Sequence, residues 1–223
     1  MDGNGRWAAR RGLPREAGHR AGIEALRRVV RAAPNLGVKI LTVYAFSTEN
    51  WRRPASEVSA LMSLLVEFLD SETPELVAEG VALGTIGDVT VLPEVSQQAL
   101  QRALAKTAGG HRLLLNLALN YGGRAEIVRA AKKLASGVAA GAIRLEAVTE
   151  ERFAQFLDTA GLPDPDLLVR ASGEERLSNF LLWQSAYTEL WVTNTLWPDF
   201  GADHLEEALA AYRTRERRYG SHS

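Results

Sequence analysis

The 223-residue chain contains no cysteine. Disulfide bridges, thiolate metal sites and cysteine nucleophiles are therefore excluded, and a reducing compartment such as the cytoplasm is expected. No apolar run approaches the roughly 20 residues that a membrane-spanning helix needs, and no leader-like segment opens the sequence. The sequence therefore predicts a soluble, cytoplasmic protein.

Common catalytic signatures are missing as well. The sequence has neither the GxxxxGK[ST] pattern of a phosphate-binding loop nor the GxSxG pattern of a serine esterase. Its four histidines are scattered and form no cluster of metal ligands. These absences argue against nucleotide hydrolysis and esterase chemistry.

Charge of one sign is also scarce, because the net charge is -1 and the pI is about 6.5. Bulk electrostatic binding to nucleic acid is therefore not expected. The distribution is uneven, since residues 1–31 hold eight arginines against three acidic residues. A coding bias toward arginine explains most surface positions, but composition alone does not distinguish it from a phosphate site.

Apolar runs rich in β-forming residues alternate with longer helical patterns, as in βα units. With 46% hydrophobic residues and no linker-like stretch, we predict a single α/β domain over residues 1–223. A mainly parallel sheet flanked by helices is expected. The predicted strands are Lys39–Phe46, Val81–Ile86, Leu113–Asn120, Leu167–Arg170 and Glu189–Thr193.

Helical periodicity separates these strands. The predicted helices are His19–Ala33, Glu57–Ser71, Pro93–Thr107, Ala125–Ser136, Glu150–Thr159, Phe180–Tyr187 and His204–Arg217. Polar or glycine-rich residues follow four strands, as in STENW, GD, NYGGR and RASGE. Ligands of open parallel sheets bind beyond the carboxyl ends of the strands, so these ends should share one rim.

The first residues combine a carboxylate, glycines and basic groups. Residues 2–6 read DGNGR and predict a tight turn, with Arg15 and His19 at the start of the next helix. Glycines allow close approach of backbone N–H groups to an anion, and a helix N-terminus adds positive partial charge. A diphosphate could bind here, with Asp2 holding a divalent cation. An ordinary loop with a capped helix is the alternative.

Leu168 to Trp183 reads LVRASGEERLSNFLLW and joins a strand end to arginines and an apolar run. The planar fork of arginine binds two oxygens of one phosphate, so Arg170, Arg176 and Ser178 could close on one anion. Earlier in the chain, STENWRRP is either a turn that caps a helix or a substrate-binding segment.

The helix expected from Glu57 to Ser71 has an apolar arc wider than a surface helix needs. Deep burial or a subunit contact explains such an arc, and so does the wall of a hydrophobic tunnel.

Seven segments, in order, carry a family resemblance: DGNGRWA, HRAG, YAFSTENWRRP, LNYGGR, RASGEERLSNFLLWQ, LWPDF and RERRYG. Together they resemble the cis-prenyltransferase family, most closely the bacterial undecaprenyl diphosphate synthases. The resemblance covers essentially the whole chain. It implies a parallel sheet flanked by helices with a hydrophobic tunnel, a homodimer, and Mg²⁺-dependent cis addition of isopentenyl diphosphate to an allylic diphosphate, with farnesyl diphosphate as the expected primer.

The resemblance also assigns roles to residues. Asp2 and Asn50 are the catalytic residues, and Asp2 and Glu189 are the metal ligands. Asn50 is expected to orient groups rather than to act as the base, because a neutral amide is a very weak base. The substrate-binding residues are Gly3, Asn4, Gly5, Arg6, Trp7, Arg15, His19, Ser47, Thr48, Glu49, Trp51, Arg53, Arg170, Arg176, Leu177 and Ser178.

Three further expectations concern the ends of the chain and of the tunnel. Family members usually have an apolar strand before the Asp2 position, so we expect a longer natural protein that carries this strand. Arg218 and Gly220 fit a terminal R-x-G motif that reaches the partner subunit. Leu113 is expected at the far end of the tunnel, whereas Ile23 adds volume and Ala45 keeps a small residue near the rim.

The expected product is a long-chain polyprenyl diphosphate of undecaprenyl type, with transient membrane contact for its release. Two alternatives remain open. One is a short-chain or irregular cis-prenyl diphosphate synthase, for example one that couples two five-carbon units head to middle. The other is a catalytically silent, lipid-binding subunit.

Overall fold

The strands form two parallel sheets. The computed structural model describes residues 1–215, and its strands form a three-stranded sheet in the order β1-β3-β2 and a two-stranded sheet β4-β5. The strands are β1 (Ile40–Ser47), β2 (Val81–Ile86), β3 (Leu113–Tyr121), β4 (Leu167–Arg170) and β5 (Glu189–Val192). The prediction of parallel strands is confirmed, although the strands are divided between two sheets.

The central strand β3 explains why the sequence shows apolar runs rather than alternation. It lies between β1 and β2 and buries almost all of its side chains. A parallel strand covered on both faces needs apolar residues at successive positions, as in LLLNLALNY. Two of the exceptions are asparagines, and the second of them, Asn120, adopts a left-handed conformation at the end of the strand.

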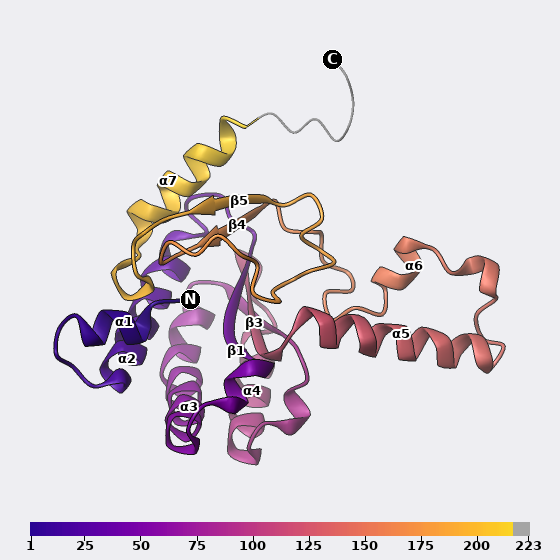
Figure 1. Cartoon of the computed structure of the whole chain (residues 1–223), viewed down its shortest axis with the longest axis horizontal. Helices are drawn as coiled ribbons and strands as arrows, with labels where there is room; N and C mark the ends of the chain where they lie inside the picture. Colours follow the sequence, from indigo (N-terminus) through magenta and orange to yellow (C-terminus); the bar gives the residue numbers. More distant parts are fainter. Residues whose placement is uncertain (216–223) are drawn as a thin grey trace.

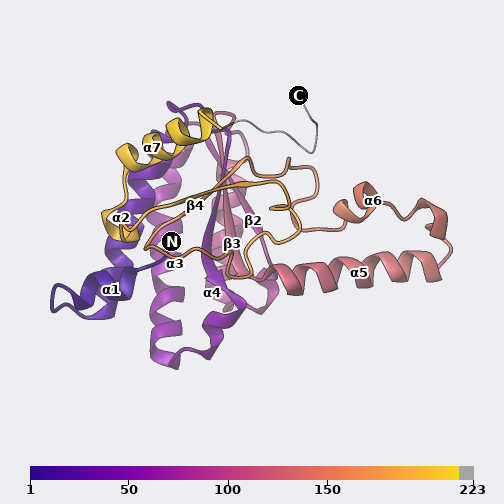
Figure 2. The ribbon, with the colours of Figure 1, turned by 45° about the horizontal axis from the view of Figure 1, so that its top comes forward.

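Helices cover the three-stranded sheet unevenly. Helices α2, α3 and α4 pack together beside it, whereas α5 and α6 extend away as an arm (Figures 1 and 2). The longer helices are α2 (Arg15–Ala32), α3 (Ala55–Ala78), α4 (Glu94–Thr107), α5 (Gly123–Ala139) and α7 (Ala202–Arg213). The shorter ones are α1 (Asn4–Ala9) and α6 (Glu150–Ala154), with 3₁₀ turns at Thr48–Arg52, Val89–Val91, Leu145–Ala147 and Trp197–Asp199.

The predicted rim is present at the carboxyl ends of the strands. Ser47 pairs with Tyr121 at the ends of β1 and β3, and Gly87 follows β2. The Asn120 side chain links the rim, because its amide donates to the Asp88 carbonyl at 2.8 Å and its oxygen accepts from Trp51 Nε1 at 2.8 Å. Segments far apart in sequence therefore meet at one edge.

Two local predictions were wrong. Residues 4–9 form helix α1, and only Gly3, with φ of 93°, keeps the turn conformation expected for residues 2–6. The helix predicted at Phe180–Tyr187 is absent, because Ser178, Asn179 and Leu181 have positive φ values that a right-handed helix excludes.

Tertiary hydrogen bonds hold that irregular segment. The backbone N–H of Gly123 donates to the carbonyl of Asn179 at 2.7 Å, and the Asn179 amide donates to Glu49 at 2.8 Å. The segment after β4 is thereby fixed against the N-terminus of α5 and against the rim. The apolar periodicity of a sequence does not reveal hydrogen bonds between distant segments, so it could not predict this irregular conformation.

Candidate active site

A cavity of about 550 Å³ lies between α2, α3 and the three-stranded sheet. We call it the tail cavity. Its volume falls in the range typical of small-molecule sites. One end is polar, with Asp2, Asn4, Arg6, Arg15, His19, Asn50, Arg53 and Glu57 in its lining. The remainder is almost wholly apolar, with walls of Ile23, Leu26, Leu61, Met62, Leu64, Leu65, Phe68, Leu117 and Leu119.

The apolar walls follow from helix geometry and from a bulge in β1. Residues spaced three and four apart share a face of a helix, which puts Leu61, Leu65 and Phe68 on the same side of α3. From Glu57 to Phe68 the cavity follows α3 for roughly 16 Å at 1.5 Å per residue. The register of β1 against β3 shifts between Tyr44 and Phe46, and Ala45 in this bulge lines the cavity.

Glu57 gathers the basic groups at the mouth of the cavity. Its carboxylate lies 3.0 Å from Arg53, 3.4 Å from Arg15 and 3.5 Å from His19 Nε2, and its side chain is only 12% exposed. Burial lowers the pKa of His19, and Arg53 adds to the effect while Glu57 opposes it. The imidazole is therefore neutral near pH 7, between two arginines. An anionic ligand of this mouth would compete with Glu57 for the same cations.

The N-terminal segment docks onto the end of β4. The Asp2 carboxylate accepts a hydrogen bond from Gly3 N at 2.6 Å and lies 3.1 Å from Arg170 Nη2. The Ser172 hydroxyl donates to the Asp2 carbonyl at 2.7 Å. A Cβ atom at Gly3 would lie 2.3 Å from the Ser172 hydroxyl oxygen, so the positive φ and the close approach both require glycine.

Beyond β4, a carboxylate joins two arginines. Glu174 lies 3.4 Å from Arg6 and 2.5 Å from Arg176, and Arg6 also donates to the Ser172 carbonyl at 3.2 Å. The Arg176 side chain is 66% exposed, whereas that of Arg170 is 16% exposed. Arg170 Nε is buried and has no hydrogen-bond partner among residues 1–215. The two arginines predicted to act together therefore sit in unlike surroundings.

The cavity lining contains part of the predicted substrate-binding set. Nine predicted residues line it: Asp2, Gly3, Asn4, Gly5, Arg6, Arg15, His19, Asn50 and Arg53. The others do not line it: Trp7, Ser47, Thr48, Glu49, Trp51, Arg170, Arg176, Leu177, Ser178 and Glu189. Of these, Arg170 contacts Asp2 directly, and Arg176 reaches the site only through Glu174.

The segment Ser47–Arg53 serves both as a turn and as part of the site. Asn50 Oδ1 accepts from Ser47 N at 3.1 Å and so caps the 3₁₀ turn that follows β1. Asn50 also lines the cavity. Trp51 packs edge-on against Phe46 and reaches Asn120, so it fixes the rim.

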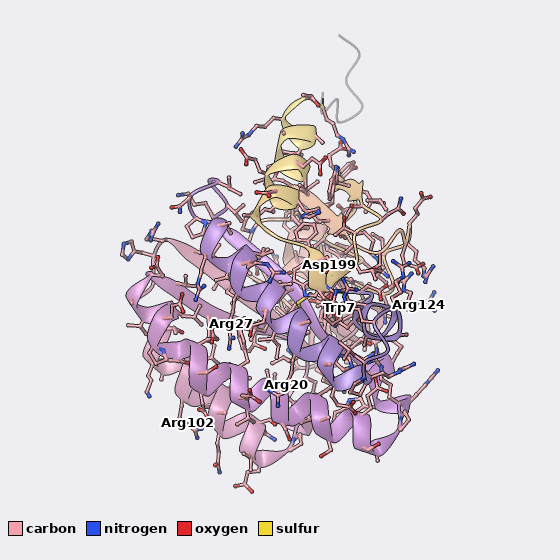
Figure 3. All side chains as sticks on the ribbon, turned by 90° about the vertical axis from the view of Figure 1, so that its left-hand side faces the viewer. Trp7, Arg20, Arg27, Arg102, Arg124 and Asp199 are labelled. Atoms are coloured by element: carbon pink, nitrogen blue, oxygen red, sulfur yellow. The ribbon has the colours of Figure 1, made fainter. Side chains whose placement is uncertain are left out.

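Two predicted residues lie away from the cavity mouth. Trp7 donates from Nε1 to Asp199 at 2.7 Å, and Arg11 stacks over its ring at 4.2 Å; Figure 3 shows Trp7 and Asp199 adjacent to each other. Glu189 begins β5 opposite Leu167, whereas Arg170, which contacts Asp2, is paired with Val192 at the other end of the ladder. Glu189 instead pairs with Arg215 at 2.6 Å.

Side chains that could bind a metal ion are not clustered within the described residues of one chain. Within residues 1–215 no group of three histidine or acidic side chains is arranged to hold a cation. Asp2 is 40% exposed beside the cavity and fits Mg²⁺, which proteins often bind through one or two carboxylates together with substrate phosphates. Arg218 and Gly220 lie outside the described residues.

Sequence reasoning missed the two carboxylates that organise the site, Glu57 and Glu174. The spacing of Arg53 and Glu57, four residues apart at a helix start, was an available signal. Leu113 is buried at 2% exposure and does not line this cavity, but it pairs with Val81 of β2, so its place at the far end of a tunnel stays a prediction. Phe68 lies at the apolar end of this cavity.

Comparisons with known proteins agree with this geometry. The protein-family model described as "Putative undecaprenyl diphosphate synthase" matches residues 1–220. The chain belongs to the undecaprenyl diphosphate synthase family. An isoprenyl transferase of Heliobacterium mobile is 57% identical over 99% of this chain and 85% of its own length. The isoprenyl transferase of Bacillus subtilis (strain 168) is 53% identical over 99% of this chain and 85% of its own.

Solved structures of the family share the fold. Lavandulyl diphosphate synthase from Lavandula x intermedia, in complex with dimethylallyl diphosphate, matches with a TM-score of 0.96 and 41% identity, over 99% of this chain and 95% of that one. A probable undecaprenyl diphosphate synthase from Campylobacter jejuni matches with a TM-score of 0.79 and 33% identity, over 90% and 92%. The chain is therefore an enzyme, a transferase of prenyl groups. No helix within residues 1–215 is both long and apolar enough to cross a membrane.

Proposed function

We propose that this enzyme elongates an allylic diphosphate, farnesyl diphosphate, by repeated cis addition of isopentenyl diphosphate, giving a long-chain product of undecaprenyl type. The tail cavity carries the proposal, because it joins a basic mouth to an apolar interior and follows α3 for roughly 16 Å from Glu57 to Phe68. Such a site accepts a diphosphate head and a hydrocarbon tail together. Membership of the family supports prenyl transfer by this site.

The mouth binds the diphosphate of the allylic primer. Arg15, Arg53 and His19 exchange Glu57 for phosphate oxygens, and the tail enters between α2 and α3. Arginine side chains aimed at the bridging and terminal oxygens stabilise the negative charge that the diphosphate acquires as its bond to the allylic carbon breaks.

Isopentenyl diphosphate binds on the β4 side of Asp2. Arg170, with its unpaired Nε, and Arg176 with Ser178 hold its diphosphate. Its double bond attacks the allylic carbon, a new carbon–carbon bond forms, and one proton leaves the extended chain. Asn50 orients the reacting groups through its amide, and a carboxylate or diphosphate oxygen accepts the proton, because a neutral amide is too weak a base.

Asp2 is the proposed magnesium carboxylate. When bound, Mg²⁺ supplies positive charge next to the diphosphates. Asp2 also fixes Arg170 and the Gly3 N–H, and so couples the two halves of the site. Glu189 can serve as a second ligand only from another copy of the chain, since within one chain it lies at the far end of β5. We therefore propose a homodimer whose sites are shared.

The protein is proposed to act in the cytoplasm and to touch the membrane transiently when the product leaves. An irregular or short-chain activity is the second candidate. It is favoured by the TM-score of 0.96 to lavandulyl diphosphate synthase, whose structure holds dimethylallyl diphosphate.

One assay separates the two activities. The purified protein is incubated with Mg²⁺, labelled isopentenyl diphosphate and either farnesyl or dimethylallyl diphosphate, and the products are separated by chromatography. A ladder of products extending from farnesyl diphosphate is expected. Growth that ends after one or two additions would contradict long-chain synthesis. A branched product from dimethylallyl diphosphate alone would establish the irregular reaction, and no turnover with either primer would indicate a silent subunit.

A further inference from the structure

A second, smaller cavity continues the tail cavity between α2 and α3. Phe68 lines both cavities. The second cavity has a volume of about 20 Å³, close to the space of a single water molecule. Its lining is Arg27, Val30, Arg31, Pro34, Phe68, Glu72, Glu75, Leu76, Glu79 and Val81.

The same helix faces line both cavities. On α3, Leu61, Leu65, Phe68 and Glu72 follow one another at spacings of four, three and four residues, which keeps them on one side of the helix. On α2, Ile23 lines the tail cavity, and Arg27, four residues later on the same side of the helix, lines the second cavity. The two cavities therefore lie along the same faces of α2 and α3, and charged side chains join the lining beyond Phe68.

The charged part is a shielded ion pair between the two helices. Arg27 Nη2 lies 2.7 Å from Glu72 Oε1, and the two side chains are 25% and 12% exposed. Both partners are held by further groups, because Arg27 also pairs with Glu24 and the Ser71 hydroxyl donates to Glu72 at 3.1 Å. The pair is thus fixed between α2 and α3.

Hydrocarbon that passes Phe68 meets this ion pair. Covering the pair with an alkyl chain would remove its remaining water and leave an imperfectly solvated charge, which is costly even for well-paired groups. A phenyl ring can change its rotamer to let a tail advance, whereas the Arg27–Glu72 pair cannot move without losing its partners.

We propose that the Arg27–Glu72 ion pair is the end stop of the tail cavity and limits the length of the product. The inference rests on the proposed elongation and assigns that site its length-determining residues. Phe68 is the first, movable barrier, and the ion pair behind it is the second, chemical one.

Another ion pair between the same two helices supplies a matched control. Arg20 Nη1 lies 2.7 Å from Glu67, as close as the Arg27–Glu72 contact, but both side chains are more than half exposed and line neither cavity. Figure 3 shows Arg20 and Arg27 along the same helix, α2. Removing either pair deletes an ion pair between α2 and α3 without changing the net charge, and removing Arg27 also deletes its hydrogen bond to Ser71.

The test compares the double variant Arg27→Met/Glu72→Leu with the control Arg20→Met/Glu67→Leu. Replacing a buried ion pair by apolar side chains of similar volume is often neutral for stability, and thermal unfolding of each variant checks this. With farnesyl and isopentenyl diphosphates, the Arg27→Met/Glu72→Leu products should become longer by one or more isoprene units. The control should give the wild-type length distribution. Equal distributions for all three proteins would overturn the proposal.

A combination with Phe68→Ala separates the two barriers. Phe68→Ala alone should lengthen the product less than the same change made together with Arg27→Met/Glu72→Leu, because the ion pair still stops the tail. If Phe68→Ala alone gives the full lengthening, the ring is the end stop and the proposal for the ion pair is wrong.

A binding assay does not depend on turnover. Non-hydrolysable prenyl thiolodiphosphates with tails of increasing length compete with the allylic primer, and the affinity of each is measured. In the wild type, this affinity should stop rising with tail length at some limit. That limit should lie at longer tails in Arg27→Met/Glu72→Leu but not in the control. A shifted limit without any elongation would refute the proposed function and keep the end stop, whereas normal elongation with an unshifted limit would refute the end stop alone.

Discussion

The mouth of the tail cavity and the segment after β4 both gather arginines, yet they are built differently. At the mouth, Arg15 at the start of α2 and Arg53 just before α3 share one shielded carboxylate, Glu57. After β4, Arg176 is exposed and the chain runs through five residues with positive φ, four of them other than glycine. The difference suggests a preformed site for the primer's tail and head, and a more adaptable one for the second diphosphate. Asp2, bound to Arg170, links them.

The largest expected effect comes from cutting that link. Asp2→Asn keeps the size of the side chain but removes the charge that pairs with Arg170 and suits Mg²⁺. We expect kcat to fall by roughly 10²–10³-fold, the loss typical for one group that stabilises developing charge. Steady-state kinetics with saturating substrates measure it.

The control for this variant is Asp199→Asn. Asp199 accepts from Trp7 and Arg11 outside the cavity, so its substitution should leave kcat near the wild-type value. Equal losses in both variants would mean that Asp2 acts through the fold rather than in the reaction.

A smaller effect should distinguish the two arginines after β4. Arg170→Lys retains the charge but loses the planar fork that could bind Asp2 and a phosphate together. The loss of one charged hydrogen bond corresponds to roughly tenfold or more in the affinity for isopentenyl diphosphate. The exposed Arg176→Lys should cost less. We expect KM for isopentenyl diphosphate to rise in that order, with little change in KM for the allylic primer.

Arg102→Lys provides the matched control, since Arg102 pairs with Asp70 on the outer side of α3 and should change neither KM. A larger loss in Arg176→Lys than in Arg170→Lys would show that the exposed segment, and not the strand end, carries the binding energy.

The smallest expected effect is a pH dependence at the mouth. Burial holds the pKa of His19 below its unfolded value of about 6.5, so the unfolded chain binds the proton more tightly. Stability is therefore lost as the pH falls through about 6.5, and the loss ends below the folded pKa. We expect this loss to be absent in His19→Gln, which has no group that titrates in this range.

Denaturant unfolding between pH 7.5 and pH 5 measures that loss, and a prenyl thiolodiphosphate probes its origin. An anion beside His19 favours the protonated ring, so the bound ligand should reduce the loss in the wild type. If the ligand has no effect, His19 does not face the diphosphate and the proposed mouth is misplaced.

Much of the fold could be predicted because burial on both faces leaves a strong pattern. β2 and β4 begin and end at the expected residues, β3 and β5 differ by one residue at one end, and β1 is shifted by one residue at both ends. Helix α3 was recognised from its wide apolar arc, but it continues past Pro74 to Ala78, beyond the expected end at Ser71. The irregular run at Ser178–Leu181 could not be predicted, since hydrogen bonds to α5 and Glu49 hold it open.

The sequence alone determined the strand order along the chain, the polar strand ends and the family motifs, because these depend on local periodicity and on residue type. Only the tertiary structure decided which motif residues share a cavity. It placed Glu57 among the basic groups of the mouth, separated Glu189 from Asp2, and set the Arg27–Glu72 pair behind Phe68 between α2 and α3. These are contacts between distant elements, and side-chain direction and burial in three dimensions fix them.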